Sequence, residues 1–472
     1  MVSSIGTYHD HSRDHGFDTI AAIATAVAPG EGSVAIVRIS GPEAEPIGHQ
    51  LFVAPGQQSW ESHRVLYGHV VDPASGERLD EALLLLMRAP RSFTRETVVE
   101  LHCHGGLVAV QRVLELVLAA GARRALPGEF SQRAFLNGRL DLTRAEAISE
   151  MITARSRRAA QLAMAGIDGG LQQRIGALRS RLLDQLAELE ARVDFEEDLP
   201  PLDRAAVVAE LEAVRCELLQ LVAEARQGEL LRQGLRVAIV GRPNVGKSSL
   251  LNLLSRRERA IVTDLPGTTR DLLESELVLD GVPLTLLDTA GIRDTSNRVE
   301  QLGIARSRAA LVAADAVLLL FDLDAGWSPE DQALLELVPA GAVLLVAGNK
   351  ADLAGLPVGL VPPGEAARAP ADVSFSALRG EGRESLVVEL LRRCGAGSLE
   401  GVQVALNARQ RDLAGAAALS LEASLEAAAQ QLPWDFWTID LRSAVRALGE
   451  ITGEEVSEAV LDRVFARFCI GK

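Results

Sequence analysis

The residues best placed to do chemistry lie between Arg236 and Ser249, in the run RVAIVGRPNVGKSS. Within it, Gly241–Ser248 has the G-x-x-x-x-G-K-S spacing of a phosphate-binding Walker A loop. In such a loop, backbone N–H groups turn towards the β-phosphate, Lys247 bridges β- and γ-oxygens, and the Ser248 hydroxyl ligates Mg²⁺. Average glycine usage would produce these fixed positions by chance only about once in tens of chains this long. The run therefore predicts a nucleoside triphosphate site.

Three further segments follow in the order that a guanine-nucleotide switch requires. The first, Asp288–Gly291, ends an apolar run, so its carboxylate can face the metal while a glycine N–H reaches the γ-phosphate. The second, Asn349–Asp352, ends in a carboxylate that can accept hydrogen bonds from N1–H and the exocyclic amine of guanine, which adenine does not present in this way. The third, Ser376–Leu378, fits the loop whose backbone amide holds the guanine O6.

Each of these segments alone is a weak signal, but all occur in order and each follows a strand-like run. The nucleotide is therefore predicted to be GTP, with Ser248 and Thr269 as the Mg²⁺ ligands. The predicted nucleotide-binding residues are Asn244, Val245, Gly246, Lys247, Ser248, Ser249, Thr263, Thr268, Thr269, Asp288, Thr289, Ala290, Gly291, Asn349, Lys350, Asp352, Ser376, Ala377 and Leu378.

One position departs from the small switch GTPases. In those proteins a glutamine directly after D-x-x-G orients the attacking water, whereas this chain has Ile292, which has no hydrogen-bonding group. Another group must therefore handle the water. Asn244 and the threonine-rich segment Thr263–Asp271 are consistent with a K⁺ site, because an amide oxygen and loop carbonyls can surround a cation that neutralises developing charge. A simpler interpretation, in which Asn244 only stabilises the loop, stays open. Arg270 is a further catalytic candidate.

The elements that must position these residues are a set of strands with helices around them. The apolar spacing predicts a GTPase domain over residues 235–397, with strands at Val237–Val240, Leu284–Leu287, Ala342–Ala347 and Val373–Phe375 and a helix at Ser249–Leu254. Before and after it, the 3.6-residue apolar period predicts helices over Asp141–Gln233, with a break at 198–203, and over Gln403–Gln431 and Thr438–Phe468. This order indicates a helical domain into which a nucleotide-binding domain is inserted.

The N-terminal part has a different character. Residues 1–17 lack apolar periodicity and are predicted to be a disordered tail. Residues 18–136 are predicted to form an α/β or α+β domain, with strands at Thr19–Ala28, Val34–Ile39 and Ala82–Met87 and a helix at Leu107–Ala119.

Two features of that domain could carry chemistry. The run His102–Gly106 is compatible with a metal site or a Cys–His nucleophile. Three adjacent ligands, however, cannot complete a tetrahedral metal site without a ligand from elsewhere in the chain. A tight Gly-Gly turn at a helix start, with amides that face an anion, is the favoured interpretation. The charges of Arg38 and Glu100 stand in apolar surroundings and need a partner or a ligand. An internal ion pair is the simplest alternative.

The amino-acid composition indicates the broad class of the protein. The chain has 472 residues, enough for about three domains, with 48% apolar residues and a formal charge of −16. It is predicted to be a soluble globular protein, because no apolar run reaches membrane-spanning length and no secretory leader opens it. The acidic balance argues against a nonspecific coat on nucleic acid. The cysteines are too scattered for a disulfide framework or zinc cluster, which predicts a reducing, cytoplasmic setting. They are Cys103, Cys216, Cys394 and Cys469.

These motifs identify a family resemblance. The chain resembles the MnmE (TrmE) tRNA modification GTPases along nearly its full length after the tail. Besides the GTPase motifs, the resemblance rests on Val37–Gly41, Val99–Gly106, Pro127–Asn137 and the terminal Phe468-Cys-Ile-Gly-Lys472. It implies a homodimer formed by the N-terminal domains, a 5-formyltetrahydrofolate-type donor and K⁺-stimulated GTP hydrolysis. It further implies a partner that uses FAD, with which the protein adds an aminomethyl or carboxymethylaminomethyl group to C5 of the wobble uridine in tRNA.

The resemblance also assigns residues. Arg38, Glu100, Arg139 and Lys472 match the family's folate contacts, although the family often has lysine where this chain has Arg139, and bidentate geometry differs between the two. The potassium site matches Asn244, Thr263, Leu265 and Thr268, and Glu300 matches the acidic residue that acts on the hydrolytic water. Cys469 is a reactive-thiol candidate. From spacing alone, a buried apolar cysteine that packs the last helix is the better interpretation.

The predicted architecture is an α/β P-loop GTPase domain inserted into a helical bundle, preceded by an α+β folate-binding domain. Its segments are residues 1–17, 18–136, 137–234, 235–397 and 398–472. Two rival functions stay open: a ribosome-assembly GTPase switch, for which a basic RNA-binding module is expected and none is found, and a GTP-regulated folate-dependent one-carbon transferase that does not act on tRNA.

Overall fold

The computed structural model describes residues 18–28, 32–195, 199–255, 274–288, 311–361, 370–396 and 405–472. The chain divides into two compact units. Unit 1 comprises Met1–Ser149 and Gly449–Lys472, and unit 2 comprises Glu150–Leu448. No helix within the described ranges is both long and apolar enough to span a bilayer. Each unit is described by itself.

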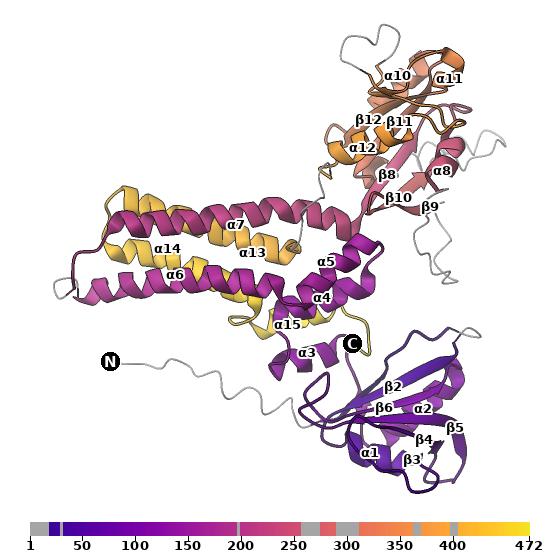
Figure 1. The fold of residues 1–472 in the computed structure, drawn as a ribbon, viewed down its shortest axis with the longest axis vertical. Helices are drawn as coiled ribbons and strands as arrows, with labels where there is room; N and C mark the ends of the chain where they lie inside the picture. Colours follow the sequence, from indigo (N-terminus) through magenta and orange to yellow (C-terminus); the bar gives the residue numbers. More distant parts are fainter. Residues whose placement is uncertain are drawn as a thin grey trace. The chain divides into compact units, whose positions relative to one another are not determined.

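Unit 1 is built on a seven-stranded sheet with the order β3-β4-β5-β6-β2-β1-β7. Its strand pairs are antiparallel except for the parallel pair of β1 and β7. Helices α1 and α2 bury their apolar stripes against one face of this sheet (Figure 1). The strands are β1 (Ile20–Ile23), β2 (Val34–Ser40), β3 (Phe52–Val53), β4 (Val65–Val71), β5 (Arg78–Met87), β6 (Val98–His104) and β7 (Arg123–Arg124), and the two helices are α1 (Ala44–Leu51) and α2 (Leu107–Ala119).

Alternation along the strands separates a core face from a second face. In β2, Val37 and Ile39 are fully buried in the core that α1 and α2 cover, so Arg38 between them points to the opposite side. The predicted strand at Thr19–Ala28 is wrong in length, because β1 ends at Ile23. The predicted helix Leu107–Ala119 is confirmed.

The C-terminal residues return to unit 1. Helices α3 (Glu129–Leu136), α4 (Leu142–Thr153) and α15 (Glu458–Phe465) follow the sheet, and α4 continues past the end of the unit's first segment. Leu142 of α4 packs with Val464 and Phe465 of α15 in one buried cluster. The predicted helical stretch Thr438–Phe468 consists of two helices, since α14 ends at Thr452 and α15 begins at Glu458.

Unit 2 contains a second seven-stranded sheet, with the order β13-β14-β12-β11-β8-β10-β9. The inner strands pair in parallel, whereas β9 and β13 at the edges run antiparallel to their neighbours. These elements are β8 (Leu235–Val240), α8 (Lys247–Ser255), β9 (Glu274–Leu279), β10 (Val282–Asp288), β11 (Ala316–Asp322), α10 (Pro329–Glu336), β12 (Val343–Asn349), α11 (Ala351–Ala354), β13 (Gly359–Leu360), β14 (Val373–Ser374) and α12 (Arg383–Arg393).

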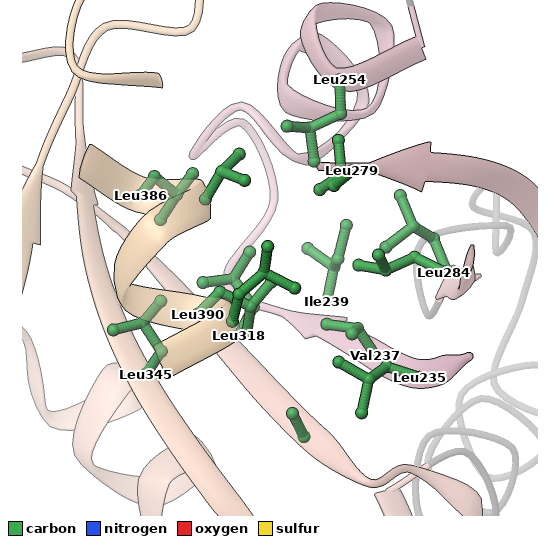
Figure 2. Close-up of a cluster of buried hydrophobic side chains, with 14 of the residues drawn as sticks. Leu235, Val237, Ile239, Leu254, Leu279, Leu284, Leu318, Leu345, Leu386 and Leu390 are labelled. Carbon is green, nitrogen blue, oxygen red and sulfur yellow. The ribbon is translucent and has the colours of Figure 1, made fainter. Parts of the chain in front are cut away.

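Strand β8 is buried on both faces, as the inner strand of a parallel sheet must be. Val237 and Ile239 pack with leucines of α8 and α12 on one side, as Figure 2 shows. Ala238 and Val240 belong to a separate cluster on the other side, against which α10 packs. The sheet is therefore covered on both faces, and the loops at the carboxyl ends of its parallel strands are available for ligands.

The remaining helices of unit 2 form a bundle (Figure 1). Helix α7 starts at an Asp203 cap and buries Val207, Leu211 and Val214 at helical spacing. It packs against the alanine-rich face of α13. A Cβ added to Gly228 would lie 2.1 Å from the Cβ of Ala405, which precedes α13. The helices are α5 (Arg157–Ile167), α6 (Gly170–Phe195), α7 (Arg204–Gln233), α13 (Ala408–Ala429) and α14 (Trp434–Thr452).

Candidate functional site

The predicted phosphate loop joins β8 to α8. Both glycines of the motif lie where a side chain cannot fit: a Cβ on Gly241 would lie 2.4 Å from the Leu320 carbonyl oxygen, and a Cβ on Gly246 would lie 2.1 Å from Asn349 Nδ2. Gly246 has φ +102° and Asn244 has φ +63°, so the backbone turns through left-handed conformations before the helix starts. The predicted run Asn244–Ser249 thus forms a strand-to-helix loop with helix N–H groups at its mouth.

The lysine of the motif lies over this loop. Lys247 Nζ donates to the carbonyl oxygens of Gly241 (2.6 Å) and Arg242 (2.8 Å). Its ammonium is therefore held at the loop itself, where it can meet phosphate oxygens.

Arg242 ties the phosphate loop to the start of α10, a contact that the sequence did not indicate. Arg242 Nε donates to Asp331 Oδ1 at 2.8 Å, and the Asp331 side chain is 0% exposed. The other oxygen of Asp331 accepts from the Ser328 N–H and hydroxyl in a capping box. The capping pattern predicts the helix start, but nothing in it indicates the arginine as a partner.

The two guanine-type loops meet the phosphate loop through Asn349, which is 2% exposed. Asn349 Nδ2 donates to the Val245 carbonyl oxygen at 2.8 Å, and Asn349 Oδ1 accepts from the Ala377 N–H at 2.9 Å. One side chain therefore joins three predicted segments. In the last of them, the Ser376 hydroxyl accepts from the Arg379 N–H, and Leu378 is 87% exposed.

Two charged residues of the base-recognition segment have ion-pair partners. Lys350 Nζ donates to Asp322 Oδ2 at 2.7 Å. Burial alone would raise the pKa of Asp322, but hydrogen bonds from Lys350 and from two backbone amides outweigh it and lower that pKa. The Asp352 carboxylate, predicted to recognise guanine, is largely buried and lies 3.6 Å from Arg379 Nε.

Part of the predicted site lies outside the described residues. These residues are Thr263, Leu265, Thr268, Thr269, Arg270, Thr289, Ala290, Gly291 and Glu300. Asp288 is the last residue of β10 and pairs in register with Ile239 of β8. Within the described part of the chain, no group of three or more His, Cys, Asp or Glu side chains could hold a metal ion.

A second candidate site is a pocket of about 620 Å³ in unit 1. It lies on the sheet face opposite α1 and α2. Three neighbouring strands, β2, β6 and β5, each contribute one residue at the same register position, because Arg38 pairs with Glu100 and Glu100 pairs with Leu85. Three of the four predicted folate contacts therefore line one pocket. Its lining residues are Arg38, His63, Leu85, Met87, Pro90, Arg91, Ser92, Phe93, Arg95, Glu100 and Arg139.

Arg38 is the centre of a network at this pocket. Its Nε donates to Glu100 Oε1 at 2.8 Å, and its Nη1 donates to the Gly471 carbonyl oxygen at 3.1 Å. His102 Nε2 lies 3.2 Å from Glu100 Oε2. Burial by itself raises the pKa of Glu100, but the hydrogen bond to His102 and the charge of Arg38 outweigh it and lower that pKa. The internal ion pair left open by the sequence is therefore present. Lys472 is the next residue after Gly471.

Arg139 forms another part of the pocket wall. Its Nη1 donates to the Phe93 carbonyl oxygen at 2.9 Å, and its guanidinium lies over the Phe93 ring, 4.8 Å from the centroid. Burial and the nearby positive charge of Arg95 lower the pKa of Arg139.

The run His102–Gly106 is not a catalytic cluster. Strand β6 extends through His104, so only the two glycines form the turn. Cys103 is 2% exposed, and burial together with the charge of Asp80 raises its pKa to about 12. A thiol that stays protonated at neutral pH is a poor nucleophile, so the Cys–His alternative is wrong.

Cys469 lies in a different environment. Helix α15 ends at Phe465, and the Cys469 residue beyond it is exposed. Its carbonyl oxygen accepts from the Gly128 N–H at 3.3 Å. The interpretation of Cys469 as a buried cysteine that packs the last helix is therefore wrong.

The phosphate loop between β8 and α8, together with the guanine-type loops after β12 and β14, defines a P-loop GTPase domain. A family model described as "MnmE helical domain" matches residues 142–469, and one described as "GTP-binding protein TrmE N-terminus" matches residues 19–139. The chain is 71% identical over 456 residues to the tRNA modification GTPase MnmE of Synechococcus sp. (strain RCC307), covering 96% of this chain and 98% of that protein. It is 66% identical over 455 residues to the protein of the same description from Prochlorococcus marinus (strain MIT 9303), with shares of 96% and 98%. The chain belongs to the MnmE family of tRNA modification GTPases.

Two solved structures are similar to part of the chain. Aquifex aeolicus Era bound to GDP·AlF4⁻ is 26% identical, covers 39% of this chain and 66% of that chain, and has a TM-score of 0.27. The G domain of the T. maritima FeoB iron transporter is 27% identical, covers 34% of this chain and 96% of that chain, and has a TM-score of 0.23.

Proposed function

We propose that this tRNA modification GTPase is stimulated by K⁺ and works with a partner protein that uses FAD. Together they add an aminomethyl or carboxymethylaminomethyl group to C5 of the wobble uridine, with a tetrahydrofolate-bound one-carbon unit. The observation that carries the folate part is the pocket in unit 1. Arg38, Glu100 and Arg139 line it together although they are far apart in the sequence. In addition, the Gly471 carbonyl oxygen accepts a hydrogen bond from Arg38, and Lys472 is the next residue in the chain.

In the GTPase domain, the shape of the phosphate loop supports the binding of a nucleoside triphosphate. The two motif glycines keep the cradle free of side chains, and Lys247 is positioned over it. Lys247 would contact phosphate oxygens, and Ser248, with Thr269, would hold Mg²⁺. When bound, the metal would neutralise negative charge on the phosphates.

The potassium part of the proposal rests on the family resemblance, in which Asn244 of the phosphate loop matches a potassium ligand. Asn244 stands in the left-handed region at the turn of the phosphate loop, a conformation that asparagine tolerates better than most residues. It would hold K⁺ together with Thr263, Leu265 and Thr268. Glu300 would act on the hydrolytic water, with Arg270 as a further catalytic group. Equal GTP turnover in K⁺ and in Na⁺ would remove this part of the proposal.

We further propose cytoplasmic homodimers that assemble through the N-terminal domains. The proposed functional modules are residues 18–136 for folate and dimerisation, 137–234 and 398–472 for the helical domain, and 235–397 for GTP hydrolysis. The contacts group residues 449–472 with the N-terminal module. This grouping supports a role for the C-terminal Cys-Ile-Gly-Lys motif, with Cys469 as a reactive thiol, beside the folate pocket.

Nucleoside analysis of tRNA from cells that lack the protein tests the proposal. We expect the wobble-uridine modification to be missing and to return with the wild-type gene but not with Arg38→Ala. The matched control is Arg64→Ala, which removes an arginine whose ion pair with Glu61 is on the surface of the same unit. Unchanged tRNA in the deletion strain would favour a one-carbon transferase that does not act on tRNA.

A further inference from the structure

The pocket in unit 1 has a positive charge that its own carboxylate does not balance. Its lining contains four arginines and one carboxylate, Glu100. That carboxylate is already bonded to Arg38 and lies against His102. The excess is local, because the whole chain carries a formal charge of −16.

Three of these arginines have no acidic partner among the residues that the structure describes. Arg95 Nη1 donates to the Asn137 carbonyl oxygen at 2.9 Å, and Arg139 donates only to the Phe93 carbonyl. Neither of them, nor Arg91, forms an ion pair with any residue that the structure describes. Other arginines of the same unit do form such pairs: Arg88 with Glu45, Arg112 with Glu77, Arg123 with Glu129 and Arg133 with Glu96.

The positive groups also act on one another. Arg139 is only partly buried, and this partial burial is the main cause that lowers its pKa, while the like charge of Arg95 lowers it further. An anion placed between the two guanidinium groups would relieve that repulsion, since opposite charges at such sites favour the ionised forms. Arginine is well suited to this task, because its planar fork binds a carboxylate in bidentate geometry.

The segment that carries Arg91 and Arg95 is anchored. It connects β5 to β6. Its Thr94 side chain is fully buried, and Thr94 Oγ1 lies 2.7 Å from Ser40 Oγ. Asn137 Nδ2 donates to the Thr94 carbonyl oxygen at 2.7 Å. The Ser92 hydroxyl donates to the Glu96 carbonyl oxygen. The arginines therefore project from a fixed loop, which lowers the entropy cost of binding.

The remaining lining indicates the kind of molecule. Leu85, Met87 and Phe93 offer an apolar and aromatic wall for a flat ring system, and about 620 Å³ is within the usual range for a small-molecule site. Arg91, Arg95 and Arg139 are exposed, so they can reach groups that extend from the pocket into water. A nucleic-acid backbone would use such arginines too, but it would leave the apolar wall without a partner.

We propose that Arg91 and Arg95, together with Arg139, bind the carboxylates of a γ-linked oligoglutamate chain, so that the pocket prefers oligoglutamyl over monoglutamyl folates. This inference rests on the proposed folate site and extends it to the tail of the ligand. Each added γ-glutamyl residue brings one more carboxylate, and three arginines without acidic partners can bind more of them than a monoglutamate carries. The preference should weaken with salt, since these contacts are made at the exposed rim.

Calorimetric titration of the full chain with 5-formyltetrahydrofolate in its monoglutamyl and triglutamyl forms tests this inference. For the wild type, we expect the triglutamyl form to bind about tenfold tighter at low salt, and the ratio to fall several-fold at about 0.5 M salt. In Arg91→Gln/Arg95→Gln the ratio should fall to about twofold or less. The matched control, Arg64→Gln/Arg112→Gln, removes two charges of the same unit outside the pocket lining and should keep the wild-type ratio.

The outcomes separate this inference from the proposed function. If the wild type binds both forms equally, or if its ratio does not respond to salt, the tail inference is overturned while the folate site stands. If neither form binds, the folate part of the proposed function is wrong. If Arg91→Gln/Arg95→Gln keeps its folate ratio but binds unmodified tRNA more weakly in a gel-shift titration, the arginines contact RNA, and the tail inference is again overturned. The salt dependence of the wild-type affinity ratio tests the tail inference even if the double variant does not fold.

Discussion

The two candidate sites differ in what they are made of. The phosphate loop is a backbone site: its central residues are contiguous, its glycines exclude side chains, and Lys247 and Asn349 bond to loop carbonyls. The pocket in unit 1 is a side-chain site, in which strand register brings Arg38, Glu100 and Leu85 together. The difference teaches that the first site is sensitive to added atoms and the second to lost charges.

The largest expected effect comes from adding one methyl group to the backbone site. Gly246→Ala forces a Cβ into the space of Asn349 Nδ2 at a residue with φ +102°, so the loop must move or lose its link to Asn349. We expect kcat/KM for GTP to fall by at least about 100-fold, measured as phosphate release. Gly176→Ala in α6 is the matched control, because its methyl meets no atom within 4 Å. Wild-type turnover in Gly246→Ala would contradict the assignment of this loop.

The next effect tests the side-chain site by removing a charge. Arg38→Ala leaves the Glu100 carboxylate buried without its cationic partner, which we expect to cost about 3 kcal/mol in the stability of unit 1. Hydrogen exchange of peptides from β2 and β6 measures it. Arg64→Ala on the surface should change the same quantity by less than about 0.5 kcal/mol. Equal exchange in both variants would show that the Arg38–Glu100 pair is not structural.

A smaller effect sharpens the comparison, because the Arg242 side chain anchors the backbone site to α10. Arg242→Ala leaves the fully buried Asp331 without its cation and frees the loop from α10. We expect the Kd of a fluorescent GTP analogue to rise about tenfold, which corresponds to about 1.4 kcal/mol. Asp331→Asn should have a similar effect, and the double variant should be no worse than either single one. Additive effects would show that the two residues act independently.

The smallest effect concerns acid stability of the GTPase domain. The hydrogen bond from Arg392, helped by Arg393, lowers the pKa of Glu389 to about 2 against the opposing effect of burial. Because this pKa is lower in the folded than in the unfolded state, the stabilisation is full above pH about 4.3 and is lost as the pH falls towards 2. Urea unfolding should therefore show Glu389→Gln less stable than wild type at pH 7, by about 1 kcal/mol, and nearly equal to it at pH 2.5. A gap that does not change with pH would contradict this.

The difference between the backbone site and the side-chain site also explains how much of each could be predicted from the sequence. The phosphate loop and its strands could be predicted because motif, strand and helix are adjacent, so local rules are enough. The Arg242–Asp331 pair could not, since it joins residues 89 positions apart and neither one is unusual in its local sequence.

In unit 1, the isolated charges of Arg38 and Glu100 indicated either an ion pair or a ligand, and the structure contains the pair. Their grouping with Arg139 came only from family resemblance, because the register of an antiparallel sheet is not encoded near any one residue. Strand β4 was not predicted, as its alternation includes Gly68 and His69, which weaken the pattern. The break between α14 and α15 was not predicted, although Gly453 directly follows the last residue of α14 and has φ +93°, as glycines at helix ends often do.

The return of the C-terminal helix has a consequence for synthesis on the ribosome. The cluster of Leu142 and Ala145 with Phe465 and Phe468 cannot close until the segment from Gly449 has been made. Residues 150 to 448, which are 299 residues, are translated in between. At about 5–20 residues per second this interval lasts roughly 15–60 s. Leu142 and Ala145 of the nascent α4 segment therefore stay without their partners from the C-terminal segment for that time, so this helical segment exposes apolar side chains that chaperones at the exit tunnel can bind.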